Sequence, residues 1–235
     1  MMAGRARLSR RTFLIAGAAF AGAGFLPRRA SAVYAREPIS LPSTPLERNF
    51  AVLWKGDEVG FHRIAIEPDQ DGASAVVSAA IEIKVKVAFV TAYRFNHQSR
   101  EVWRGGLIES IEGVTDDDGE EVIVKGRRVG DDLEIEGPGG PLLIDSNLPT
   151  SNAIWSAKAV TWPEAIDAQY GTLTGWALKP LGRETIEVRA EPLAAEHYEF
   201  TTPYSFGDLW YDDAGILAKF HMVKEGEEID YELQA

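Results

Sequence analysis

Short runs of alternating apolar and polar residues fill the chain from residue 49 onward. The longest covers residues 75–91, and its alternation is cleanest over Ile81-Glu82-Ile83-Lys84-Val85-Lys86-Val87. A period of two predicts β-strands with one buried face. Turn sequences such as Lys55-Gly56-Asp57-Glu58 and Glu225-Gly226-Glu227 separate neighbouring runs and predict hairpins. About a dozen such strands without long alternating helices indicate an all-β, antiparallel fold.

So many strands in one domain predict curvature, because flat open sheets rarely grow that wide. We therefore expect an antiparallel curved sheet forming an open barrel or half-barrel, with a β-sandwich as the alternative. Residues 148–171 interrupt the strand pattern. Thr150 or Ser151 can cap a short helix, and Pro163 suits the first turn of another. We expect this short helical insert, which carries Trp155 and Trp162, to plug or cover the concave side.

The strand predicted over residues 93–103 has two different faces. Alternate side chains of a strand share a face, so one face carries Tyr93, Phe95, His97, Ser99, Glu101 and Trp103. The other is almost wholly hydrophilic, with Arg94, Asn96, Gln98, Arg100 and Arg104. This pattern is typical of a strand that lines the inside of a curved sheet. The candidate ligand-binding residues are therefore Tyr93, Phe95, His97, Glu101 and Trp103, although such aromatic residues more often belong to a core than to a ligand platform.

The first 32 residues resemble an export signal. A basic start precedes an apolar run over residues 12–26, and Ala30-Ser31-Ala32 offers a cleavage site. The twin-arginine motif, which directs folded chains to export, is matched by Arg10, Arg11, Phe13 and Leu14. The apolar run is short and glycine-rich for a membrane span, although an uncleaved anchor is the alternative. We predict a periplasmic or otherwise exported protein with a signal over 1–32, a proline-rich exposed linker over 33–47 and a single β-rich domain over 48–235.

Charge and cysteine content limit the partners that the protein can bind and the chemistry that it can perform. Six of the 24 Lys and Arg residues lie in the predicted signal, and none of the 36 Asp and Glu residues does. The mature 203 residues therefore carry a net charge of 18 − 36 = −18. Such a chain repels nucleic acid and anionic lipid headgroups, and we expect no nucleic-acid partner and no membrane span in the mature chain. The sequence has no cysteine, so neither a disulfide nor a catalytic thiol is available.

Catalytic motifs are scarce. The sequence lacks Gly-x-Ser-x-Gly and His-Glu-x-x-His. Its four histidines, His62, His97, His197 and His221, are spread along the chain. They could meet in space as a metal site, but separate polar positions are the simpler reading, and we predict no metal and no cofactor.

His97 and Glu101 lie on one face but about 13 Å apart along a regular strand, at roughly 3.3 Å per residue. Acid–base chemistry at either residue would require a partner from a neighbouring strand. Pairing of Glu101 with an arginine across the sheet is the structural alternative.

Several motifs resemble a family of uncharacterised exported bacterial proteins with twin-arginine signals. These motifs are Phe61-His62-Arg63, Arg94-Phe95-Asn96-His97, Arg100-Glu101-Val102-Trp103, Gly106-Leu107 and Leu209-Trp210-Tyr211-Asp212 with Gly215 and Leu217. They are also similar, more loosely, to periplasmic β-rich domains of unknown function. The resemblance implies an open, lipocalin-like or half-barrel sheet and supplies no catalytic residues.

Three functions follow as hypotheses. The first is a non-enzymatic cell-envelope module that binds a small apolar or glycan ligand, or an envelope protein, on its concave face. The second is a hydrolase of an envelope polymer that uses His97 or Glu101. The third is a structural or assembly module, expected if Trp155 and Trp162 fill the concave side. The absence of catalytic motifs favours the first over the second.

Overall fold

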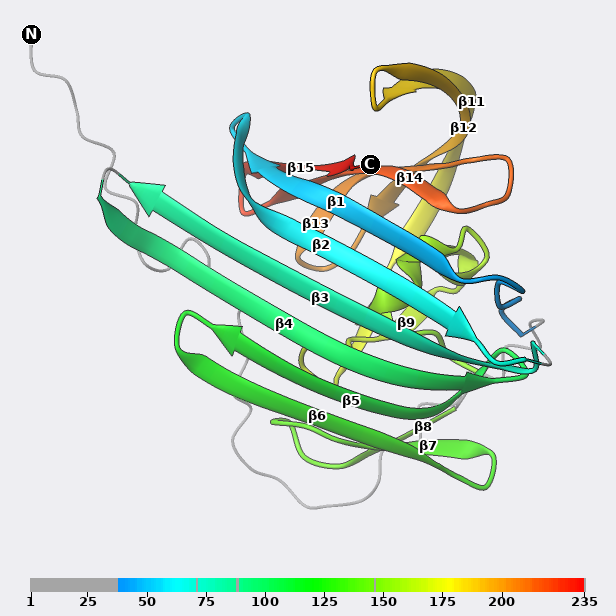
Figure 1. Cartoon of the computed structure of the whole chain (residues 1–235). Coiled ribbons are helices and arrows are strands. Elements are labelled where there is room, and N and C mark those ends of the chain that lie inside the picture. The colour runs from blue at the N-terminus through cyan, green and yellow to red at the C-terminus, as the bar shows by residue number, and fades with distance from the viewer. Residues whose placement is uncertain (1–37, 71, 88, 146, 235) are drawn as a thin grey trace, which may run out of the picture.

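The computed structural model describes residues 38–70, 72–87, 89–145 and 147–234 (Figure 1), so the predicted export signal lies outside the described residues. Antiparallel strands dominate this part of the chain. The strands are β1 (Leu46–Trp54), β2 (Asp57–Pro68), β3 (Ser74–Val87), β4 (Val90–Arg104), β5 (Leu107–Asp117), β6 (Glu120–Val129), β7 (Asp132–Glu136), β8 (Leu142–Asp145), β9 (Glu164–Ile166), β10 (Leu173–Gly175), β11 (Ala177–Val188), β12 (Glu191–Thr201), β13 (Ser205–Tyr211), β14 (Leu217–Lys224) and β15 (Glu227–Leu233).

Thirteen strands form one sheet in the order β11-β12-β13-β14-β15-β1-β2-β3-β4-β5-β6-β7-β8, and β9 and β10 form a separate pair. All neighbouring strands pair antiparallel, including β1 with β15. The sheet curls on itself but keeps β8 and β11 as free edges (Figure 1). The predicted all-β open barrel is thus confirmed.

Some local predictions were wrong. The run over residues 75–91 is not one strand, because β3 ends at Val87 and β4 begins at Val90. Pro163 starts no helix and instead precedes β9. The insert contains two short 3₁₀ helices, η1 (Ser151–Trp155) and η2 (Ala159–Thr161). Thr150 does occupy the cap position of η1, but its hydroxyl makes no capping bond.

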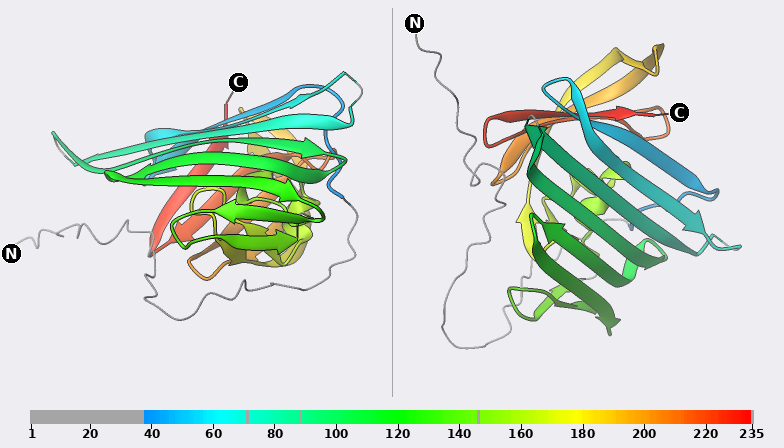
Figure 2. Two further views of the ribbon diagram at one scale, coloured as in Figure 1. Left: turned by 90° about the horizontal axis from the view of Figure 1, so that it is seen from below. Right: turned by 60° about the vertical axis from the view of Figure 1, so that its left-hand side comes forward.

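The insert lies on the concave side of the sheet (Figure 2). In the sequence it falls between β8 and β11, the two edge strands. Trp155 and Trp162 are almost completely buried there, in a cluster with Trp103 and with aliphatic side chains of β2 to β8. The contact is close, because a Cβ added to Gly113 of β5 would lie 2.8 Å from the carbonyl oxygen of Ala168. One part of the concave side is therefore filled solid by the insert.

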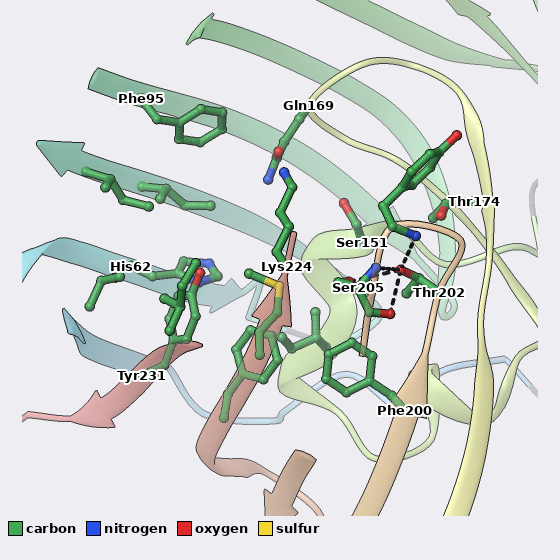
Figure 3. A pocket seen from close by; sticks show the side chains of 18 of the residues that line it. His62, Phe95, Ser151, Gln169, Thr174, Phe200, Thr202, Ser205, Lys224 and Tyr231 are labelled. Carbon is green, nitrogen blue, oxygen red and sulfur yellow. Dashed lines mark hydrogen bonds between the residues drawn. The ribbon is translucent and has the colours of Figure 1, made fainter. Parts of the chain in front are cut away.

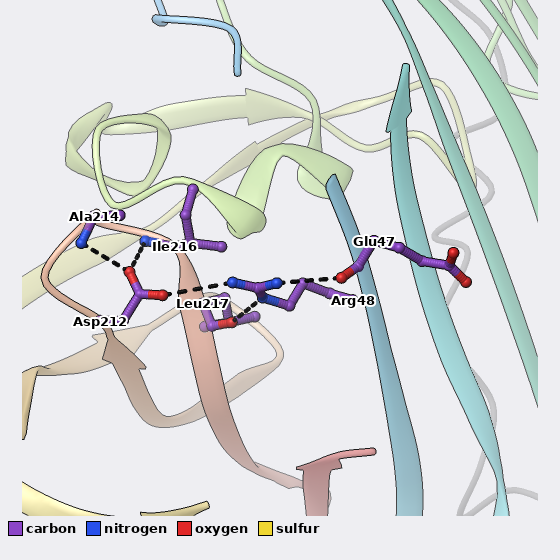
Figure 4. Close-up of polar contacts among 6 residues, drawn as sticks. All are labelled: Glu47, Arg48, Asp212, Ala214, Ile216 and Leu217. Carbon is purple, nitrogen blue, oxygen red and sulfur yellow. Dashed lines mark hydrogen bonds and ion pairs between the residues drawn. The ribbon is translucent and has the colours of Figure 1, made fainter. Parts of the chain in front are cut away.

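The insert also closes one end of the barrel. Ser156 forms an isolated bridge with Ile216, and the Tyr211 hydroxyl donates to the carbonyl of Ile154 at 3.0 Å. At the same end, Arg48 of β1 donates to the carbonyl of Leu217 at 3.3 Å and pairs with Asp212 at 3.5 Å (Figure 4). These contacts tie β1, the β13–β14 turn and the insert together.

The described part of the predicted linker is not wholly exposed. Ile39 is buried in the same cluster as Trp103, and Leu41 packs against it. An apolar side chain in this position stabilises the start of the domain by burying its surface, about 1.5–3 kcal/mol for a full isoleucine. Within the described residues, no helix is long and apolar enough to cross a membrane.

Candidate functional site

The inner face of β4 agrees with the predicted alternation. Tyr93, Phe95, His97, Glu101 and Trp103 are all buried, while Arg94, Gln98, Arg100 and Arg104 are exposed. The structure does not bring the five inner residues to one site, however. Tyr93 and Phe95 line a cavity, whereas His97, Glu101 and Trp103 are not among the residues that line it.

The cavity occupies the part of the concave side that the insert leaves open, and it has a volume of about 550 Å³ (Figure 3). This is within the roughly 300–1,000 Å³ range of small-molecule sites. Its walls come from β1 to β4, from the insert and from β11 to β15. Most of the wall is apolar, and its members include Val52, Ile83, Phe200, Leu209, Phe220 and Tyr231.

The mouth of the cavity lies at the end of the barrel opposite the closed end. Because neighbouring strands are antiparallel, the β1–β2, β3–β4, β12–β13 and β14–β15 turns all fall at this one end (Figure 1). Residues next to these turns line the cavity, among them Trp54, Val85, Tyr204 and Glu225. The cavity is therefore reached past hairpin turns.

Polar groups gather near the mouth. The hydroxyls of Tyr93 and Tyr170 donate to the two oxygens of Asp117 at 2.8 and 3.0 Å. Lys224 reaches toward Gln169 (Figure 3). Burial lowers the pKa of Lys224, and attraction to nearby carboxylates, first among them that of Asp117, partly opposes this shift. The mouth thus combines fixed carboxylate–phenol bonds with a half-buried lysine.

Two histidines lie along the row of inner residues. Register places His62 of β2 opposite Ile81, and Ile81 opposite His97. Burial lowers the pKa of each imidazole to about 4, and for His62 the nearby His97 adds to the effect. Both rings are neutral at pH 7.

Each of these rings has a nitrogen that lacks a hydrogen-bond partner among the described residues, namely Nε2. In His97 the other nitrogen, Nδ1, lies 2.9 Å from the Thr115 hydroxyl, which donates to the carbonyl of Gln169 at 3.0 Å. His97 Nδ1 must therefore be the donor in its own bond, and Nε2 carries a free lone pair. His62 lines the cavity, next to Tyr231 (Figure 3).

Glu101 and Trp103 lie in the packed part of the concave side. The Trp103 indole donates to Glu101 at 2.8 Å, and Thr150 and Asn152 of the insert donate to it at 3.0 and 2.9 Å. The alternative pairing of Glu101 with an arginine was wrong, because the insert supplies neutral donors to its side chain. Arg100 and Arg104 of the same strand lie on the outer face and cannot reach it. Burial raises the pKa of Glu101, and these hydrogen bonds oppose the shift.

The other two histidines are far from this row in the sheet. His197 contacts Asp208 and Glu184 and stacks on Trp210, and His221 bonds to Asp230 at 2.8 Å. No cluster of three or more metal-ligand side chains occurs within the described ranges.

Sequence reasoning missed much of the cavity wall. Tyr231, Phe220 and Phe200 come from the C-terminal hairpins, and Lys224 comes from the end of β14. Their alternation with polar residues marks them as inward-facing, but only the β15–β1 pairing places them across from β4. That long-range pairing left no local signal in the sequence.

The fold and cavity define a barrel-like, all-β class of protein with an apolar hollow between its sheet and its insert. The chain belongs to a family described as a domain of unknown function, DUF6134, which matches residues 50–234. None of the curated proteins compared with the chain matches its sequence.

A crystal structure of a beta-barrel-like protein of domain of unknown function DUF1849, from Brucella abortus, is similar in fold. Its TM-score is 0.58 at 9% identity, and the match covers 83% of this chain and 97% of the other. At this identity the likeness concerns the fold alone.

Proposed function

We propose that the chain is an exported, periplasmic, non-enzymatic protein that binds a small apolar molecule in the cavity of its open barrel. The observation that carries the proposal is the cavity of about 550 Å³, whose wall is mainly aliphatic and aromatic. Water contacts an apolar wall of this extent unfavourably, and an apolar ligand that fills the cavity gains the free energy of burying its own surface.

His62 is a polar member of the mainly apolar cavity wall. Its Nε2 is buried and has no partner within the described part of the chain. A neutral imidazole nitrogen of this kind can accept or donate one hydrogen bond, and leaving it unmade costs roughly 1–3 kcal/mol. A mainly apolar molecule suits this cavity better than a glycan, whose many hydroxyls would lose their water against an apolar wall.

The test is binding of a fluorescent apolar probe, N-phenyl-1-naphthylamine, and its displacement by a long-chain alcohol. The double variant Ile83→Trp with Met222→Trp fills the cavity from two sides, and we expect at least tenfold weaker binding. The matched control is Val114→Trp, because Val114 is exposed on the outer face. Equal binding by the filled variant and the control, both folded, would refute the proposal.

Phe95 and Trp103 are not a suitable pair for this test, although both face inward. Phe95 lines the cavity, but Trp103 lies in the packed cluster with Trp155. Loss of both side chains would report on stability as much as on binding. Phe95→Ser alone is the better variant of β4 for testing ligand binding.

A further inference from the structure

The open end of the barrel exposes an apolar hairpin tip. In the β3–β4 hairpin, Phe89 is fully exposed and Val90 is 69% exposed, with Val87 beside them. The β12–β13 turn at the same end exposes Tyr204 and, just beyond it, Phe206. Exposed apolar residues gathered on one end of a molecule mark contact with a membrane or with another protein.

Residues 83–95 differ in charge from the rest of the acidic chain, so attraction to an anionic surface is confined to this hairpin. Residues 83–95 contain Lys84, Lys86 and Arg94 and no acidic residue, although the chain has 36 Asp and Glu residues. Arg94 is paired with Asp116 at 2.8 Å. Lys84 and Lys86 are exposed. Apolar side chains flanked by lysines are complementary to an anionic lipid surface, where the ammonium groups meet phosphates while the apolar groups enter the acyl boundary.

The shape of the end favours contact through this hairpin. The tip projects beyond the neighbouring β5–β6 turn in both views of the sheet (Figure 1 and Figure 2). That turn carries Asp116, Asp117 and Asp118, which an anionic surface repels. A projecting tip allows Phe89 and Val90 to reach a bilayer while the acidic turn stays in water.

We propose that the β3–β4 tip docks the open end of the barrel on an anionic lipid bilayer. Phe89 and Val90 enter the headgroup region, and Lys84 and Lys86 face the lipid phosphates. This inference goes beyond the proposed binding function, because docking does not require an occupied cavity. Val85 and Tyr93 of the same hairpin line the cavity, so docking through the tip would hold one wall of the cavity near the lipid surface.

A single-cysteine probe tests the contact locally, since the native chain has no cysteine. Val90→Cys in the full chain is labelled with the environment-sensitive dye NBD and mixed with vesicles of phosphatidylethanolamine and phosphatidylglycerol. The matched control is Val129→Cys, because Val129 is an exposed valine at the end of β6, at the opposite end of the sheet. A local dye separates contact by the tip from any contact made by the apolar residues 12–26.

We expect NBD emission to rise and shift to the blue at position 90 but not at position 129. Phe89→Asp in the Val90→Cys background should abolish the change. Lys84→Gln with Lys86→Gln should weaken vesicle affinity about 25-fold, from roughly fivefold for each lysine. We expect all variants to keep the native circular dichroism spectrum, because the altered side chains are exposed.

No response at position 90, an equal response at both positions, or an unchanged response after Phe89→Asp would overturn the proposal. Equal affinity for vesicles of phosphatidylcholine alone would also overturn it, because the lysines would then play no part. Binding of N-phenyl-1-naphthylamine by the same variants in the absence of vesicles is measured separately. Its loss would count against the cavity proposal and not against docking.

Discussion

Replacing Glu101 with alanine should destabilise the protein strongly, because Glu101 links β4 to the insert. Its side chain is completely buried and accepts hydrogen bonds from Trp103 at 2.8 Å, Asn152 at 2.9 Å and Thr150 at 3.0 Å. Asn152 also donates to Ser99 at 2.8 Å, which extends the network along β4. Glu101→Ala removes the acceptor for three donors at once.

The magnitude follows from those three donors. A buried donor left without an acceptor costs about 1–3 kcal/mol. A water molecule entering the space of the lost side chain would satisfy some of them, so we expect a loss of about 3–5 kcal/mol in the free energy of unfolding. Glu101→Gln keeps the volume and one acceptor oxygen, but its amide must face a donor. We expect Glu101→Gln to lower the free energy of unfolding by about 1–2 kcal/mol. Part of the loss is offset because the amide is neutral, whereas burial disfavours the charged carboxylate of Glu101 and raises its pKa.

Urea unfolding followed by tryptophan fluorescence measures both values. The control is Glu112→Ala, an exposed glutamate of β5, which should change stability by no more than about 0.5 kcal/mol. A double-mutant cycle of Glu101→Gln with Asn152→Ala should show a coupling energy of at least about 0.5 kcal/mol. If Glu101→Ala unfolds at the same urea concentration as the control, the link between strand and insert is not what stabilises this region.

Two further predictions concern the inner face. Burial lowers the pKa of His62 and His97 to about 4, so between pH 6.5 and 4 the unfolded chain binds protons that the folded chain does not. Their contribution to stability is complete above pH 6.5 and is lost as the pH falls to 4. His62→Phe should therefore reduce the drop in Tm between pH 7 and pH 5, and an undiminished drop would contradict the assignment. Gly113→Ala should lower Tm by several degrees, because the new Cβ would lie 2.8 Å from the Ala168 oxygen. An unchanged Tm in that variant would mean that the insert shifts freely on β5.

Local pattern predicted the strands better than the site. The alternation over residues 93–103 predicted which side chains of β4 face inward, because a period of two is fixed by strand geometry. It could not separate Phe95, which lines the cavity, from Trp103, which is packed beneath the insert. That difference depends on where residues 151–166 fold back, and their 3₁₀ turns and short strand have weak sequence signals. The prediction of Pro163 as a helix start failed for the same reason.

The export signal, the compartment and the absence of a cofactor remain predictions from the sequence. The family match and the fold likeness concern a domain of unknown function and a barrel-like shape. Neither bears on where the protein acts. Detection of the mature chain in a periplasmic fraction, and its loss when Arg10 and Arg11 are replaced by lysine, would test the export prediction.

The pairing of β1 with β15 has a consequence for how the chain matures. Phe50 lies opposite Leu233, 183 residues away, in the middle of the sheet. During synthesis, one side of β1 therefore has no strand to pair with until β15 (Glu227–Leu233) has left the ribosome. The half-finished sheet would present this bare edge to other chains, which is a known route to aggregation. A chaperone that shields residues 46–54, or rapid completion of translation, would then raise the yield of native protein.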